Sequence, residues 1–125
     1  MAKKQKQPFD NRKGLLMLPI SMILSDNYQT LYPYAKQLML HMQIHWRGDK
    51  PVAFGVREAM SVLRCNKRTA IKAFKELQSR GFIIKVGESV FNSRAGSKAR
   101  VWHLTWLPFN YLEPTKEWEK WTDEN

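Results

Sequence analysis

The sequence predicts an α+β fold, mainly helical, with a β-hairpin towards the C-terminal end and a short last helix. Between Gly55 and Gly81, apolar residues recur at steps of three and four in two runs, separated by a polar break at residues 64–66. This is the pattern of two amphipathic helices joined by a turn. After Gly81, two apolar runs flank a polar loop with two glycines, residues 87–99, as in a hairpin. A chain of 125 residues is long enough for one modest core.

The formal net charge of +10 is distributed unevenly along the chain. Residues 1–14 hold five Lys and Arg side chains against one Asp and show no periodicity, so we expect a flexible basic N-terminal arm. Residues 113–125 form an acidic segment with a formal charge of −3 and two tryptophans. The part between them, residues 15–112, carries +9 and is the predicted domain. A cationic domain favours a polyanionic partner.

The first long helix is expected at residues 32–46, because Pro33 is tolerated only in the first turn of a helix. Most of its apolar residues fall on one wide stripe, but Leu40 and Ile44 fall on roughly the opposite side. Two explanations remain for this second stripe. Either residues 15–24 or the C-terminal tryptophans cover it within the chain, or it is the interface of a homodimer.

Local signals delimit the elements that follow. Residues 52–54 suit a short edge strand, and Gly55 then takes an N-cap position with Glu58 three residues on, which is half of a capping box. Gly81 is placed to end the second helix of the pair in a left-handed conformation. Strands are predicted at residues 82–86 and 100–106.

The acidic C-terminal segment contains the last predicted helix. It is expected at residues 116–121, with Thr115 as its cap. Trp118 and Trp121 are three residues apart and are expected to pack this helix against the body. Stacking on nucleic-acid bases is the alternative use of such tryptophans.

The second helix of the pair has a cationic face. Arg68, Lys72 and Lys75 follow at steps of four and three, so their side chains project along one stripe opposite the apolar face. Such a helix can pack its back on a domain and place its front in a groove of nucleic acid. The alternative is an ordinary solvated face, since Lys commonly fills exposed helix positions.

The predicted order of helix, short strand, helix, turn, helix and hairpin over residues 31–107 resembles the winged helix-turn-helix DNA-binding domains of bacterial regulators and of phage, plasmid and integrative-element proteins. The likeness is strongest in REAMSVLRCNKRTAIKAFKELQSRGFI and in ARVWHLTWLP after the hairpin. Arg64 departs from the pattern, because many relatives have a turn glycine there. The matching positions in the turn, the second-helix core and the helix exit are Leu63, Cys65, Asn66, Thr69, Ala70, Ala73, Phe74, Leu77, Gly81, Phe82 and Ile83.

The resemblance implies DNA binding with residues 67–80 as the recognition helix. Residues at its N-terminal end are best placed for base edges and phosphates. The planar fork of Arg68 suits a guanine, whereas Lys72 and Lys75 suit phosphate. The candidate DNA contacts of this helix are Asn66, Lys67, Arg68, Thr69, Lys72 and Lys75.

Two further groups of basic residues are candidate DNA contacts. Arg94, Lys98 and Arg100 lie in the hairpin, the wing of such domains, and are expected to contact the minor groove or the backbone. A charged hairpin also keeps an exposed strand edge soluble, which is the alternative explanation. The basic residues of the N-terminal arm are expected to add phosphate contacts, and they are Lys3, Lys4, Lys6, Arg12 and Lys13.

Metal binding and catalysis are not expected. His41 and His45 have an i, i+4 spacing that can hold zinc, and Cys65 and His103 would complete four ligands, but no paired cysteine motif accompanies them. We predict structural or surface histidines, a buried and inert Cys65, and neither a metal nor a cofactor. The sequence also lacks a recognisable set of nucleophile, base and orienting residue, so we do not expect an enzyme.

The sequence-based hypothesis is a sequence-specific, double-stranded DNA-binding protein, a transcriptional regulator of a bacterial or mobile-element system. The alternatives are a replication, partition or excision accessory protein of a phage or plasmid, or a winged-helix adaptor that binds a protein through its C-terminal segment. The start MAKKQKQ lacks an apolar core, so a cytoplasmic, nucleoid-associated location is expected. The longest apolar run, residues 14–24, is too short to cross a membrane.

Overall fold

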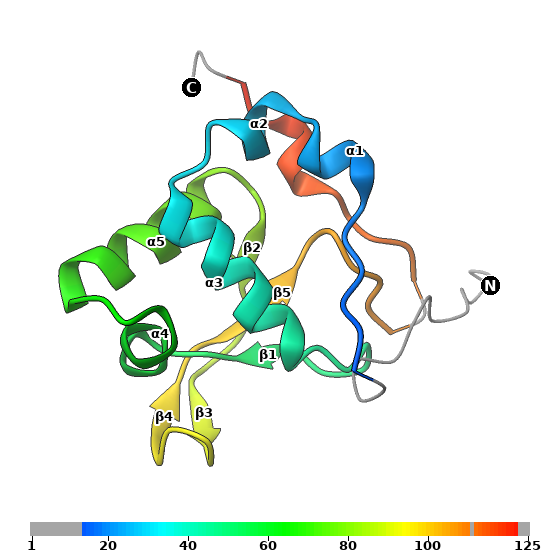
Figure 1. Ribbon diagram of the computed structural model, residues 1–125. Helices are drawn as coiled ribbons and strands as arrows, with labels where there is room; N and C mark the ends of the chain where they lie inside the picture. Colours follow the sequence, from blue (N-terminus) through cyan, green and yellow to red (C-terminus); the bar gives the residue numbers. More distant parts are fainter. Residues whose placement is uncertain (1–13, 111, 123–125) are drawn as a thin grey trace.

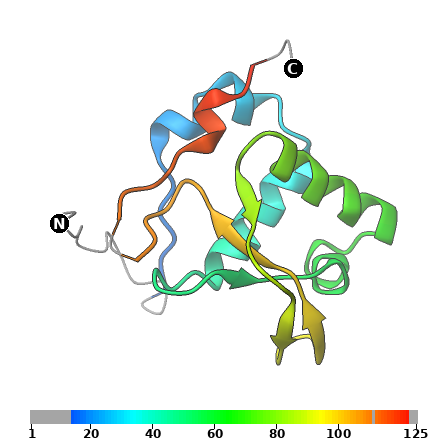
Figure 2. The ribbon, with the colours of Figure 1, turned by 180° about the vertical axis from the view of Figure 1, so that it is seen from behind.

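A computed structural model describes residues 14–110 and 112–122 of the chain (Figures 1 and 2). Within these ranges the fold is of the predicted α+β class. The basic residues of the N-terminal arm lie outside the described residues. In chain order the elements are α1 (Ile20–Ile23), α2 (Asp26–Gln29), α3 (Pro33–Ile44), β1 (Val52–Ala53), α4 (Val56–Leu63), α5 (Lys67–Ser79), β2 (Ile83–Lys85), β3 (Val90–Asn92), β4 (Ser97–Ala99), β5 (Val101–Leu104) and the 3₁₀-helix η2 (Glu117–Lys120).

The strands form a three-stranded antiparallel sheet in the order β1-β5-β2 and a separate hairpin, β3–β4. In the sheet, Trp102 of β5 lies opposite Val52 of β1 on one side and Lys85 of β2 on the other. The hairpin extends from the body at the end opposite α1, α2 and η2, as both views show. Of the polar loop expected at residues 87–99, residues 90–92 and 97–99 are strand, and residues 93–96 form the turn between them.

One hydrophobic core lies between the sheet and helices α3, α4 and α5. Trp102 stacks on Phe74 of α5, with ring centroids 5.4 Å apart and planes 20° from parallel. Offset stacking of this kind adds to the stabilisation that burial of the two rings provides. The apolar stripe predicted for the helix at residues 32–46 is buried, and its members are Ala35, Leu38, Met39, Met42 and Trp46.

Both ends of α5 are held by the residues that sequence patterns predict there. Asn66 caps the first turn, because its Oδ1 accepts a hydrogen bond from the Thr69 backbone N–H at 2.8 Å. At the other end Gly81 has a φ of +83°, as predicted. Its N–H donates to the Gln78 carbonyl at 3.2 Å and the Phe82 N–H to the Leu77 carbonyl at 2.9 Å, which is a Schellman motif.

Arg64, the departure from the family pattern, lies in the turn between α4 and α5. This residue is the C-cap of α4 and has a φ of 53° and a ψ of 54°, a left-handed conformation that favours glycine. An arginine adopts it at a cost of roughly 1 kcal/mol. Cys65, which was predicted to be buried, is only half-buried, although it does pack against the core.

Two predictions about helix ends were wrong. Gly55 is the N-cap of α4 as predicted, but the Glu58 carboxylate accepts hydrogen bonds from Asn92 and Arg94 of the hairpin instead of completing a capping box. The last helix is not capped by Thr115. It is a 3₁₀-helix whose N-cap is Lys116 in a left-handed conformation with a φ of 55°.

The C-terminal segment packs against the body, as the tryptophan spacing predicts. Trp118 is buried and stacks on Phe82, with the planes 6° from parallel and the centroids 6.3 Å apart. Arg80 at the end of α5 lies over the ring of Trp121, with 4.4 Å between the guanidinium carbon and the ring centroid. The C-terminal tryptophans and residues 15–24 leave the second stripe of α3 open to solvent. Leu40 is 38% exposed and Ile44 is 43% exposed.

None of the helices in the described ranges is long and apolar enough to cross a membrane.

The close approach of the C-terminal segment to Gly81 generates a stability prediction. A Cβ at this position would lie 2.7 Å from the Glu117 carbonyl oxygen, and the backbone is left-handed. Gly87 is a matched control, because its φ is also positive but a Cβ there meets open space. We expect Gly87→Ala to lower the free energy of unfolding by about 1 kcal/mol and Gly81→Ala by roughly 3 kcal/mol or more. Urea unfolding measures both, and equal losses would contradict the proposed contact.

Candidate nucleic-acid interface

The cationic stripe of α5 lies on the solvent side of the helix. Arg68, Lys72 and Lys75 are exposed, whereas the opposite face of α5 is buried in the core. This division follows from the helical period, since steps of three and four keep side chains on one face. The structure therefore places these three predicted DNA contacts together on one accessible surface.

The N-terminal end of α5 is also exposed. Asn66 and Lys67 are exposed and Thr69 is half-buried, and the first turn contains no acidic residue. The positive end of the helix dipole is therefore not neutralised by its own side chains, which favours an anion. Because the Asn66 oxygen is used as the cap, its amide nitrogen is the atom left for a ligand.

Lys72 has a partner within the chain. Its Nζ lies over the ring of Tyr32, 4.2 Å from the ring centroid, at the start of α3. A cation–π contact at an exposed site contributes only about 0.5 to 1 kcal/mol. The ammonium group can exchange the ring for a phosphate at little cost.

A groove of about 490 Å³ separates α5 from the hairpin. Its polar rim combines Lys75 of α5 with Lys98 and Arg100 of the other wall. Residues 98, 100 and 102 share one face of their extended segment because side chains alternate along it, and Trp102 points to α5. The apolar floor consists of Phe54, Val56, Ile71, Phe74 and Trp102.

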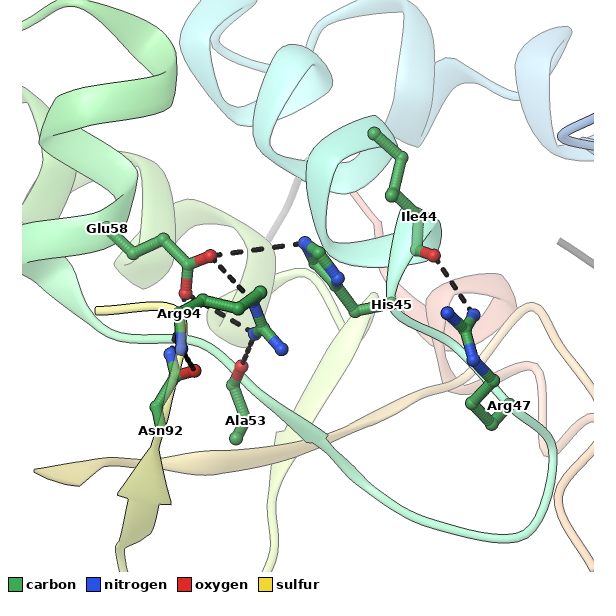
Figure 3. Close-up of polar contacts among 7 residues, drawn as sticks. All are labelled: Ile44, His45, Arg47, Ala53, Glu58, Asn92 and Arg94. Carbon is green, nitrogen blue, oxygen red and sulfur yellow. Dashed lines mark hydrogen bonds and ion pairs between the residues drawn. The ribbon is translucent and has the colours of Figure 1, made fainter. Parts of the chain in front are cut away.

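Arg94 is held elsewhere, against α4 (Figure 3). Its Nε lies 2.9 Å from Oε2 of Glu58, and its guanidinium also donates to the Ala53 carbonyl. Asn92 donates to Oε1 of the same carboxylate at 2.7 Å. We call this group of Glu58, Asn92, Arg94 and Ala53 the hairpin clamp. A guanidinium already paired with a carboxylate is a weaker phosphate ligand, so the structure favours an anchoring role for Arg94.

The surroundings of two histidines lower their pKa. Burial, reinforced by the positive charge of Arg94, lowers the pKa of His45, although Glu58 lies 3.9 Å away and acts in the opposite direction. Burial also lowers the pKa of His103. Its ring packs edge-to-face with the ring of Phe109, with 5.0 Å between the centroids and 82° between the planes. Within the described ranges, no group of three or more His, Cys, Asp or Glu side chains is close enough to hold a metal ion.

Sequence reasoning missed the hairpin clamp and the position of Phe91. Glu58 was interpreted through its own helix, and Phe91 was assigned to a loop. The segment SVFNSRAGSKAR does contain a signal for both, since Val90 and Asn92 alternate with Phe91 as in a strand, and Gly96 follows at a turn position. Strands of three residues give a weak pattern, however, and the partner of Glu58 is 34 residues away.

Comparison with known proteins leaves the family open. No family model matches the chain. No curated protein matches it either. The chain is similar to a solved structure described as "N-Terminal domain of DNA binding protein", with 20% sequence identity, 97% coverage of both chains and a TM-score of 0.47.

The two lowered histidine pKa values generate a pH prediction. Both groups have an ordinary pKa of 6.5 in the unfolded chain and a lower one in the folded chain, so the unfolded chain binds more protons below that pH. The free energy of unfolding should therefore be highest above about pH 6.5. It should fall as the pH drops towards the pKa values that the two histidines have in the folded chain. Urea unfolding at several pH values measures this, and the double variant His45→Gln, His103→Gln should flatten the decline. An unchanged slope in that variant would contradict the assignment.

Proposed function

We propose that this protein is a winged helix-turn-helix protein that binds double-stranded DNA in a sequence-specific manner. The element order from α3 to β5, the sheet order β1-β5-β2 and the projecting hairpin support this fold. The observation that most supports the function is the groove between α5 and the hairpin, which Lys75, Lys98 and Arg100 line beside the exposed stripe of α5. A groove with cationic walls suits a phosphodiester backbone.

In this proposal α5 enters the major groove with its N-terminal end first. Arg68 donates to the O6 and N7 atoms of a guanine, while Asn66, Lys67 and Thr69 contact neighbouring bases or phosphates. One DNA strand then passes through the groove beside the hairpin, and its phosphates meet Lys75 and Lys98. The charge of +9 on residues 15–112 supplies the long-range attraction.

We also propose what the protein does once it is bound to DNA. The sequence resemblance suggests a transcriptional regulator of a bacterial or mobile-element system. A replication, partition or excision accessory protein would use the same surface to position other proteins on DNA. A reporter placed behind the selected DNA site would separate them, because only a regulator alters expression without further element proteins.

Variants of α5 test the proposed DNA contacts. After selection of a preferred duplex from a random pool, Arg68→Ala should weaken binding to it by about 1 to 3 kcal/mol and relax the base preference at one position. Lys75→Ala should weaken binding to all duplexes and reduce the slope of affinity against salt by about one. Lys50→Ala is the control, because it removes an exposed positive charge from the α3–β1 loop.

The outcomes separate the parts of this proposal. If Arg68→Ala and Lys75→Ala bind the selected and random duplexes as the parent does, α5 is not the reading helix. If no duplex is enriched and binding does not depend on salt, the protein does not act by binding DNA.

We extend the proposal to a homodimer through the exposed stripe of α3. Winged-helix proteins that act on two-fold DNA sites do so as dimers, and Leu40 and Ile44 are exposed apolar residues on one helix face. The double variant Leu40→Ser, Ile44→Ser should then sediment as a folded monomer, with a melting temperature at low concentration close to that of the parent. A parent protein that sediments as a monomer at every concentration would overturn the dimer.

A further inference from the structure

The hairpin strand β3 presents two apolar side chains to solvent, and Phe91 is the larger and the more exposed of them. Phe91 in β3 is 68% exposed, more than any other aromatic residue among the large exposed hydrophobics of the described ranges. The next residue, Asn92, is 3% exposed and belongs to the hairpin clamp. Because successive strand residues point to opposite faces, the inward position of Asn92 directs Phe91 outward.

Strand pairing shows which surface Phe91 belongs to. It lies directly opposite Lys98 in the β3–β4 register, so both side chains share one face of the hairpin. Lys98 lines the groove beside α5 together with Arg100 and Ser89, which is two residues before Phe91 in the same segment. Phe91 therefore projects from the groove side of the hairpin, further towards its tip, among side chains that attract phosphate.

The hairpin clamp anchors the strand that carries Phe91 to the pair of helices α4 and α5. Glu58 belongs to α4, which is joined to α5 by the short turn at residues 64–66. Its carboxylate accepts hydrogen bonds from Asn92, the neighbour of Phe91, and from Arg94 in the turn. The backbone that carries Phe91 is therefore anchored to α4 through Asn92 and Arg94, so this strand loses little further freedom when it binds.

From this placement we infer that Phe91 is an apolar wedge that enters the minor groove beside the α5 site and partly unstacks a base step. The inference rests on the proposed function, because it names how the hairpin engages the same DNA. Insertion of an apolar side chain between base pairs costs unstacking energy, and the bend that results brings more phosphates to the protein. Here Lys98 and Arg100 are the cations placed to receive them.

The chemistry also determines which DNA the wedge prefers. Pyrimidine–purine steps such as TA and CA unstack and kink most easily. Phe91 makes no hydrogen bond to a base, so it selects such steps through their deformability. The protein should therefore distinguish flanking sequences outside the bases that α5 reads.

A fluorescent base provides the test. The probe is the selected duplex with 2-aminopurine moved step by step through the flank, since its emission rises when it is unstacked. We expect a rise at one step on binding of the parent and no rise with Phe91→Ala. Affinity for duplexes with TA at that step should fall roughly tenfold in this variant, and the advantage of TA over a stiff AA step should disappear.

Two variants serve as controls. Val90→Ala removes a 46% exposed apolar side chain from the opposite face of the same strand, so it should retain the fluorescence rise. Phe91→Leu keeps an apolar wedge and should restore most of the signal that Phe91→Ala loses. Melting curves of all variants establish that the hairpin change leaves the fold intact.

Each outcome decides between the inference and the proposed function. If the parent binds the duplex, Lys75→Ala weakens it, and Phe91→Ala matches the parent in fluorescence and in preference for TA, the wedge is wrong and DNA binding stands. If Phe91→Ala changes only the sedimentation mass of the protein, Phe91 is a contact between two copies of the chain and the wedge is again wrong. If the parent binds no duplex, both proposals fail.

Discussion

The packing of Trp102 is the interaction on which the arrangement of this protein depends. This residue belongs to the central strand β5, stacks on Phe74 of α5 and donates its Nε1–H to the Phe54 carbonyl at 2.9 Å. One buried side chain thus connects the exposed helix to the sheet and to the segment that leads into α4. Because the indole is 2% exposed and its one donor is satisfied, it stabilises the site without a compensating polar cost.

The hairpin clamp divides the basic residues of the hairpin by role. Glu58 has a side chain that is only 10% exposed, so its charge requires close partners, and Arg94 and Asn92 provide them. Arg94 is consequently directed to the body, while Lys98 and Arg100 remain on the groove side. These three basic residues lie close together in the sequence but have different surroundings, and only two of them line the groove.

Local patterns predicted the helical part of the site well. The expected recognition helix at residues 67–80 compares with α5 at Lys67–Ser79, because its apolar period, its Asn66 cap and its Gly81 terminus are all determined within a few residues. The hairpin was predicted less well, since strands of three residues carry little periodicity. The C-terminal helix was misjudged at its cap, where Lys116 is left-handed and its N–H donates to the distant Thr105 carbonyl at 2.9 Å.

The sequence by itself determined the fold class, the helix pair, the cationic stripe and the excess of positive charge, because each of these depends on residue type and short-range spacing. Only the tertiary structure decided which distant residues meet. It joined Lys75 to Lys98 and Arg100 across a groove, paired Glu58 with Arg94, and left Phe91 on the groove side of the hairpin. These contacts arise from strand register and from the burial of a charge, and neither is encoded in the spacing of neighbouring residues.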